Sequence, residues 1–92
     1  MGKYKIVSSS KAKSDLKEIH RSGNKQIMRK LEKLLIELSE HPTTGTGKPE
    51  KLKGVEGIWS RRIDKKNRLI YAIKEQEIIV LLLSVLGHYS DK

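Results

Sequence analysis

The clearest pattern in the sequence is an apolar stripe that recurs at helical spacing between Lys25 and Glu40. Its members fall three or four positions apart, as on one face of an α-helix: Ile27, Leu31, Leu34, Leu35 and Leu38. Asn24 is a good N-cap for this helix, and Pro42 favours its end, because the residue before a proline is disfavoured in the helical region. An amphipathic helix must bury its stripe, so the rest of the chain has to supply a second layer.

Two shorter elements are predicted before this helix. Lys3 to Val7 partly alternates between polar and apolar residues and predicts a first strand. Lys11 to His20 carries three apolar residues at helical spacing and predicts a short helix. The serines at positions 8–10 supply a hydroxyl that can cap it.

Three strands are predicted in the C-terminal half. Ile58 to Ile63 and Leu69 to Ile73 are joined by the polar turn Asp64 to Asn67. Glu77 to Leu86 contains six apolar residues in succession, which favours a strand covered on both faces. A strand, two helices and then antiparallel strands predict an α+β domain in which the helices pack on an antiparallel sheet.

Size and charge limit the functions that such a chain can have. The 92 residues suit one domain, spanning positions 1–92, with little room for a large organic cofactor. Twenty Lys and Arg against 11 Asp and Glu give a net charge of +9, so nucleic acid is the first partner to consider. The chain has no cysteine, no secretory signal pattern and no apolar run approaching the ~20 residues of a membrane span. We therefore expect a cytoplasmic protein.

The loop from Thr43 to Lys53 contains the first candidate site residues. Glu50 is a single carboxylate among Lys48, Lys51 and Lys53, whose charges favour its ionised form and suit phosphate contacts. The glycines of the loop would allow a close approach to a ligand, although the P-loop spacing is missing. A solvated loop glutamate without a function is the alternative interpretation.

Arginines on the strands supply a second group of candidates. Arg61 and Arg62 must point to opposite faces of an extended strand, so at most one of them can join a common site. Arg68 begins the partner strand across the turn. Guanidinium groups suit phosphate because they offer paired donors and keep their charge. Exposed arginines paired with carboxylates are the alternative, and Trp59 is expected in the core.

The last candidate follows the most apolar strand at Gly87-His88-Tyr89. A histidine can give or take a proton near neutral pH. Cleavage of RNA by its own 2′-hydroxyl needs a base, a cation for the phosphorane charge and an acid for the departing 5′-oxygen. Glu50, Arg68 and His88 match these roles in kind. The reaction requires no metal, and the sequence shows no cluster of metal ligands.

These segments resemble one known family. Gly45 to Lys53, Trp59 to Ile63, Arg68 to Ala72 and the final His88-Tyr89 closely resemble the YoeB/Txe toxins of the RelE superfamily. The resemblance implies a RelE-like fold of two helices against a twisted antiparallel sheet. It also implies a metal-independent endoribonuclease without a cofactor, which enters the ribosomal A site and cleaves the messenger RNA there.

The same resemblance suggests a role for each matching residue. Glu50 would be the general base, Arg68 the stabiliser of the transition state, His88 the general acid, and Tyr89 would position or stack on the RNA. Two further basic positions match those that hold the phosphate backbone: Lys53 and Arg62. The products would be a 2′,3′-cyclic or 3′-phosphate and a free 5′-hydroxyl.

The partners implied are messenger RNA, the ribosome and a cognate antitoxin that presents an acidic or apolar segment, and the chain could also form a homodimer or a toxin–antitoxin hetero-oligomer. Two features depart from the family pattern, namely a basic first helix and the short tail from Ser90 to Lys92.

Two alternative functions stay open. One is a gyrase-inhibiting toxin of the ParE type, which shares the fold without the acid–base set, and the other is a non-catalytic protein that binds RNA or the ribosome.

Overall fold

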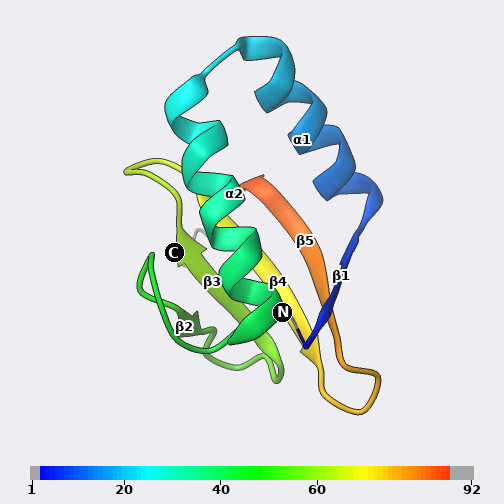
Figure 1. The fold of residues 1–92 in the computed structure, drawn as a ribbon. Coiled ribbons are helices and arrows are strands. Elements are labelled where there is room, and N and C mark those ends of the chain that lie inside the picture. The colour runs from blue at the N-terminus through cyan, green and yellow to red at the C-terminus, as the bar shows by residue number, and fades with distance from the viewer. Residues whose placement is uncertain (1–2, 88–92) are drawn as a thin grey trace.

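Two helices lie on one face of a five-stranded sheet in the computed structural model, which describes residues 3–87 (Figure 1). The predicted class, two helices packed on a sheet, is confirmed. The elements follow in chain order: β1 (Lys5–Ser8), α1 (Ser10–Ser22), α2 (Lys25–Glu40), β2 (Glu50–Lys51), β3 (Ile58–Arg62), β4 (Arg68–Lys74) and β5 (Ile79–Gly87). Only β2 was missed by the sequence analysis, because two residues carry no periodic signal.

The strand order across the sheet is β1-β5-β4-β3-β2. The pairs β2–β3, β3–β4 and β4–β5 are antiparallel, and this confirms the pairing expected for the three predicted C-terminal strands. The first strand differs, because β1 runs parallel to β5, with Lys5 opposite Ile79 and Ser8 opposite Leu82. The sheet is therefore mixed. The apolar pattern of a strand does not reveal which neighbour it joins or in which direction, so the sequence could not predict this pairing.

Side chains cap both helices at the positions expected from the sequence. The hydroxyl of Ser9 accepts a hydrogen bond from the Ala12 backbone N–H at 3.1 Å, and Asn24 Oδ1 accepts one from Ile27 at 3.1 Å. Gly23 ends α1 in the left-handed conformation, at φ +71°. The turn between the helices is therefore short and fixed.

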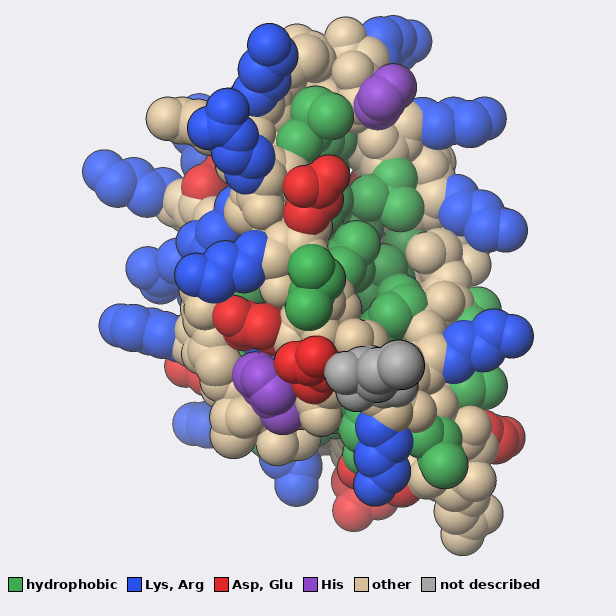
Figure 2. Space-filling view, viewed as in Figure 1, with side chains coloured by type: hydrophobic (Ala, Val, Ile, Leu, Met, Phe, Trp, Pro, Cys, Tyr) green, Lys and Arg blue, Asp and Glu red, His purple; other side chains and the backbone are tan. Residues whose placement is uncertain are grey.

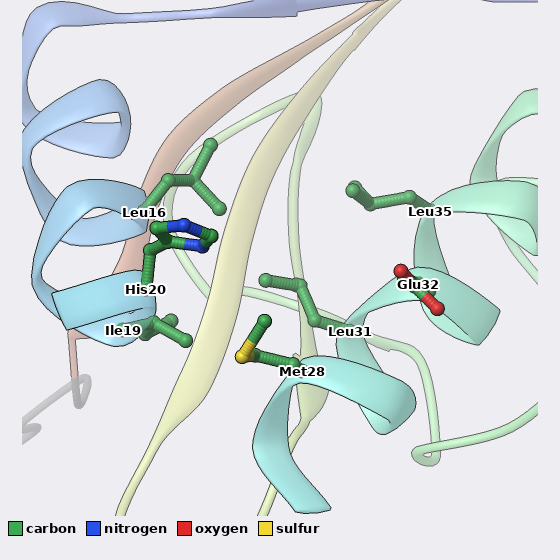
Figure 3. A pocket seen from close by; sticks show the side chains of 7 residues that line it. All are labelled: Leu16, Ile19, His20, Met28, Leu31, Glu32 and Leu35. Atoms are coloured by element: carbon green, nitrogen blue, oxygen red, sulfur yellow. The ribbon is translucent and has the colours of Figure 1, made fainter. Parts of the chain in front are cut away.

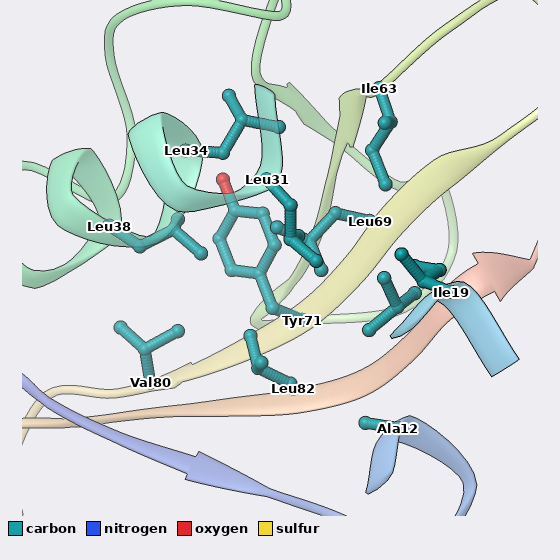
Figure 4. Close-up of a cluster of buried hydrophobic side chains, with 11 residues drawn as sticks. Ala12, Ile19, Leu31, Leu34, Leu38, Ile63, Leu69, Tyr71, Val80 and Leu82 are labelled. Carbon is teal, nitrogen blue, oxygen red and sulfur yellow. The ribbon is translucent and has the colours of Figure 1, made fainter. Parts of the chain in front are cut away.

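The core lies between the helices and the sheet, where the stripe of α2 meets residues of β4 and β5 (Figure 4). Its buried members come from both layers: Ala12, Ile19, Leu31, Leu34, Leu38, Ile63, Leu69, Tyr71, Val80, Leu82 and Val85. Trp59 packs against this cluster, as predicted. On β5, Leu81 and Leu83 are only half-buried. The strand is therefore fully covered on the helix side only, and the prediction that both faces are covered is wrong for the other side.

The two helices leave an apolar hollow of about 260 Å³ between them (Figure 3). Residues from both helices line it: Leu16, Ile19, His20, Met28, Leu31, Glu32 and Leu35. Hydrophobic side chains gather there on the surface, with lysine and arginine side chains on either side (Figure 2). Neither helix has the length and hydropathy needed to cross a membrane, and they are the only helices within residues 3–87.

Candidate functional site

The two arginines of β3 point to opposite faces of the sheet, as the alternation of an extended strand predicts. Arg61 is fully buried on the side of the helices, where its Nη1 donates to Glu37 Oε1 at 2.8 Å. Arg62 is exposed on the outer face. Of this pair, only Arg62 is therefore placed to join a site on the outer face.

Strand register brings Glu50 and Arg68 together on that outer face. Glu50 lies opposite Ser60, and Arg62 lies opposite Arg68, so all four side chains point away from α2. Arg68 Nη1 and Glu50 Oε1 are 3.6 Å apart, with side chains that are 32% and 69% exposed. Such an exposed ion pair contributes only about 0–1 kcal/mol to stability, so it leaves both groups available to a ligand.

Arg61 holds the loop that leads to Glu50. Its guanidinium group donates to three loop carbonyls, of His41 at 2.8 Å, Thr44 at 2.6 Å and Thr46 at 3.3 Å. Glu37 completes the arrangement by accepting from the backbone N–H of Thr46 at 2.7 Å and from its hydroxyl at 2.8 Å. Burial alone would raise the pKa of Glu37, but the hydrogen bonds from Thr46 and the Arg61 charge outweigh it and lower the pKa.

Tyr71 extends this network into the core. Its hydroxyl donates to the carbonyl of Pro42 at 2.6 Å and accepts from Arg61 Nε at 3.3 Å. Burial raises the pKa of Tyr71, partly offset by the Arg61 charge. We call the set formed by Arg61, Glu37 and Tyr71 the inner network. It fixes the start of the loop from the side of the sheet opposite to Glu50.

Two glycines let the loop pack closely against β3 and α2. Gly47 has φ +86°, and its carbonyl accepts from the Arg62 backbone N–H at 2.7 Å. A Cβ on Gly47 would lie 2.8 Å from the carbonyl oxygen of Arg62, so no side chain fits there. Gly45, at φ +116°, is crowded by Glu37 in the same way. The sequence analysis attributed these glycines to ligand approach, and their contacts are with the fold instead.

The loop lysines do not all share the face of Glu50. Lys48, Lys51 and Lys53 are exposed. Lys51 lies opposite Trp59, so it points to the side of the helices, away from Glu50. The structure therefore brings Glu50, Ser60, Arg62 and Arg68 together, and we call these four residues the outer-face group. Lys51 lies on the other side of the same sheet edge.

His88 and Tyr89 lie outside the described residues. Strand β5 ends at Gly87, which is the register partner of Arg68. In the sequence, His88 directly follows this residue that pairs with Arg68. Within residues 3–87, no group of three or more His, Cys, Asp or Glu side chains could hold a metal ion.

Asp15 is a buried carboxylate that the sequence analysis missed. It anchors α1 to an irregular part of β5 by accepting from the backbone N–H groups of Val85 at 2.9 Å and Leu86 at 3.0 Å, and it also pairs with Lys11 at 2.7 Å. Burial alone would raise the pKa of Asp15, but these hydrogen bonds lower it. A signal was available, because Asp15 is three residues after Ala12 and so falls on the apolar face of the helix.

Comparison with known proteins agrees with this fold. The family of YoeB-like toxins of bacterial type II toxin–antitoxin systems matches residues 9–89. The toxin YoeB of Mycobacterium bovis is 38% identical over 61 residues, covering 65% of this chain and 72% of its own.

Solved structures give the same result over nearly the whole chain. A YoeB dimer from Staphylococcus aureus superimposes with a TM-score of 0.82 and 31% identity, covering 95% of this chain and 99% of that one. A heterotetrameric YoeB–YefM toxin–antitoxin complex from the same organism gives a TM-score of 0.78 and 32% identity, covering 94% and 98%. From the family match and these relatives together, the chain belongs to the YoeB-like toxins of bacterial type II toxin–antitoxin systems.

Proposed function

We propose that this toxin is an endoribonuclease that cleaves messenger RNA in the ribosomal A site by attack of the 2′-hydroxyl. The observation that carries the proposal is the outer-face pair, in which a carboxylate, Glu50, lies 3.6 Å from a guanidinium group, Arg68. A base for the 2′-hydroxyl and a cation for the phosphate are the two groups that such a reaction needs side by side.

Each step has a candidate residue. Glu50 takes the proton of the 2′-hydroxyl, and the freed oxygen attacks the adjacent phosphorus. Arg68 offers paired N–H donors to the charge that develops on the phosphorane oxygens. His88 gives a proton to the 5′-oxygen as its bond to phosphorus breaks, leaving a 2′,3′-cyclic phosphate and a 5′-hydroxyl. Tyr89 positions or stacks on a base of the RNA.

The loose geometry of the outer pair supports this assignment. Glu50 is exposed and Arg68 is only half-buried, so a phosphate can replace Glu50 as the partner of Arg68 without opening the core. That exchange would leave the carboxylate free to act as a base. Arg62 adds positive charge on the same face, and the exposed Lys48 and Lys53 lie within three residues of Glu50 in the chain and can add more for the RNA backbone.

A reconstituted translation assay with primer-extension readout tests the proposal. We expect the wild type to cut the message in the A-site codon, and Glu50→Gln and His88→Ala each to remove the cut. Glu56→Gln is the matched control, because Glu56 is also an exposed glutamate near β2 but lies outside the outer-face group.

Intact message with the wild-type protein would contradict the proposal. DNA supercoiling by gyrase would then be measured, since inhibition there would favour a toxin of the ParE type. Cleavage that persists in Glu50→Gln and His88→Ala would instead reject the acid–base pair while keeping the nuclease.

We also propose a cognate antitoxin as a partner, acting in the cytoplasm, where the messages and ribosomes are. The YoeB–YefM complexes of Staphylococcus aureus support it. The net charge of +9 suits an acidic segment, and the apolar hollow between α1 and α2 suits hydrophobic side chains. Co-expression with the antitoxin should restore growth, and light scattering of the purified proteins would give the stoichiometry and detect a toxin homodimer.

A further inference from the structure

Ser60 carries a buried hydroxyl group that makes no hydrogen bond to the part of the chain that the structure describes. It is a residue of β3, directly before Arg61, and is 1% exposed. Its Oγ has no hydrogen-bond partner among the described residues, and it is the only buried side-chain N or O atom there with none. A buried hydroxyl without a partner lowers stability, because its bonds to water are lost and not replaced. Stability alone would therefore favour alanine at this position.

The register places this hydroxyl next to the candidate base. Ser60 lies directly opposite Glu50 on one side and opposite Ile70 on the other. Directly opposed residues of an antiparallel pair have Cβ atoms about 4.5–5.5 Å apart on the same face. Arg62 is two residues along the same strand, and Arg68 is the diagonal neighbour of Ser60 on the adjacent strand β4. Ser60 is thus central to the outer-face group.

The unused hydroxyl also matches a need that the proposed reaction creates. Within residues 3–87, the carboxylate of Glu50 is oriented only by Arg68, at 3.6 Å. Once a phosphate occupies Arg68, Glu50 loses that partner and needs another donor to keep it directed at the 2′-hydroxyl. A serine hydroxyl beside it can donate to one carboxylate oxygen and leave the other to take the proton.

We propose that Ser60 is a positioning residue that donates a hydrogen bond to Glu50 when RNA is bound. This inference rests on the proposed nuclease function. It gives the buried hydroxyl a partner in the complex that it lacks in the free protein. The free energy lost in the free state is then recovered when the substrate binds.

Single-turnover cleavage of ribosome-bound message by Ser60→Ala and Ser60→Thr tests the inference. We expect Ser60→Ala to slow the cleavage step by about 10- to 100-fold, the range of one hydrogen bond to a charged group. The melting temperature should be equal or higher, because an unpartnered hydroxyl has been removed, whereas affinity for the message-loaded ribosome should fall, because the hydrogen bond that forms on binding is lost. Ser60→Thr keeps the hydroxyl and should recover most of the rate.

A double-mutant cycle separates positioning from a general structural effect. Glu50→Asp withdraws the carboxylate from Ser60, so adding Ser60→Ala to Glu50→Asp should slow cleavage less than it does in the wild type. Equal losses in the two backgrounds would overturn the inference. So would a wild-type rate in Ser60→Ala, or a rate loss that is accompanied by a lower melting temperature and is not recovered in Ser60→Thr.

The same assay keeps the two proposals apart. If the wild type cleaves and Glu50→Gln does not, a wild-type rate in Ser60→Ala rejects only the role of Ser60. If the wild type itself does not cleave, the nuclease proposal fails, and the inference about Ser60 fails with it.

Discussion

The two faces of the sheet carry the same three kinds of group in different states. The inner network, on the side of the helices, consists of Arg61, Glu37 and Tyr71. The outer-face group matches these with Arg68, Glu50 and Ser60, and it also contains Arg62. Inside, the arginine and carboxylate are 2.8 Å apart, the arginine is fully buried, and the hydroxyl both donates and accepts. Outside, the ion pair is 3.6 Å long and exposed, and the hydroxyl has no partner among the described residues.

The burial and pairing of these groups, rather than their residue types, distinguish the residues that stabilise the fold from those that can bind a ligand. A buried arginine whose donors are all engaged has no capacity left for a ligand, and its removal would leave its partners uncompensated. An exposed and loosely paired arginine stabilises little and can exchange its partner. The inner network therefore supports the loop, and the outer-face group can act on RNA. Substitutions that affect stability and activity separately should reveal this division.

The largest effect is expected from Arg61→Met. It should lower the free energy of unfolding by about 3–5 kcal/mol, because the carboxylate of Glu37 and three loop carbonyls lose a buried charged partner. Urea denaturation measures this loss. Arg62→Met, the same change on the exposed neighbour, is the control and should stay within about 0.5 kcal/mol of the wild type. Similar losses in both variants would contradict the division.

Arg68→Lys should show the opposite profile. We expect the cleavage rate to fall by about 100-fold, because an ammonium group cannot offer paired donors to the phosphorane oxygens, while the free energy of unfolding stays within about 0.5 kcal/mol. Arg29→Lys, on the exposed side of α2, is the control for the loss of a guanidinium group. If Arg68→Lys lost stability as well as activity, Arg68 would be a residue that stabilises the fold, like Arg61.

The sequence indicated more of the outer-face group than of the inner network. The segments that contain Glu50 and Arg68 resemble a known family, and alternation alone separated Arg61 from Arg62. The sequence did not show that Glu50 and Arg68 lie together, which depends on the strand register, and it gave no sign of Ser60. Nothing in the sequence showed that Arg61 would be buried, because its partners are backbone carbonyls of a loop without periodicity. The parallel pairing of β1 was missed for a similar reason, since it depends on the path of the chain rather than on the residues of the strand.

Acid should weaken the inner network in a defined direction. The pKa of Glu37 is lowered in the folded protein, so its contribution to stability is present above its unfolded value near 4.5 and is lost as the pH falls through the folded value. Glu37→Gln should therefore flatten the decrease in unfolding free energy as the pH falls below the unfolded pKa of Glu37. Urea titrations at several pH values measure it. A decrease as steep as in the wild type would contradict the assigned hydrogen bonds.

The smallest effect, and the most direct test of which face meets RNA, concerns Arg62 and Lys51. Arg62 shares the outer face with Glu50, whereas Lys51 points to the side of the helices. If RNA contacts the outer face, Arg62→Gln should reduce the salt dependence of ribosome binding by about one unit of slope, because one phosphate contact is lost. Lys51→Gln should reduce it less. The reverse order would mean that RNA passes along the helix side of β2, and the outer-face pair would then be too far from the phosphates to cleave them.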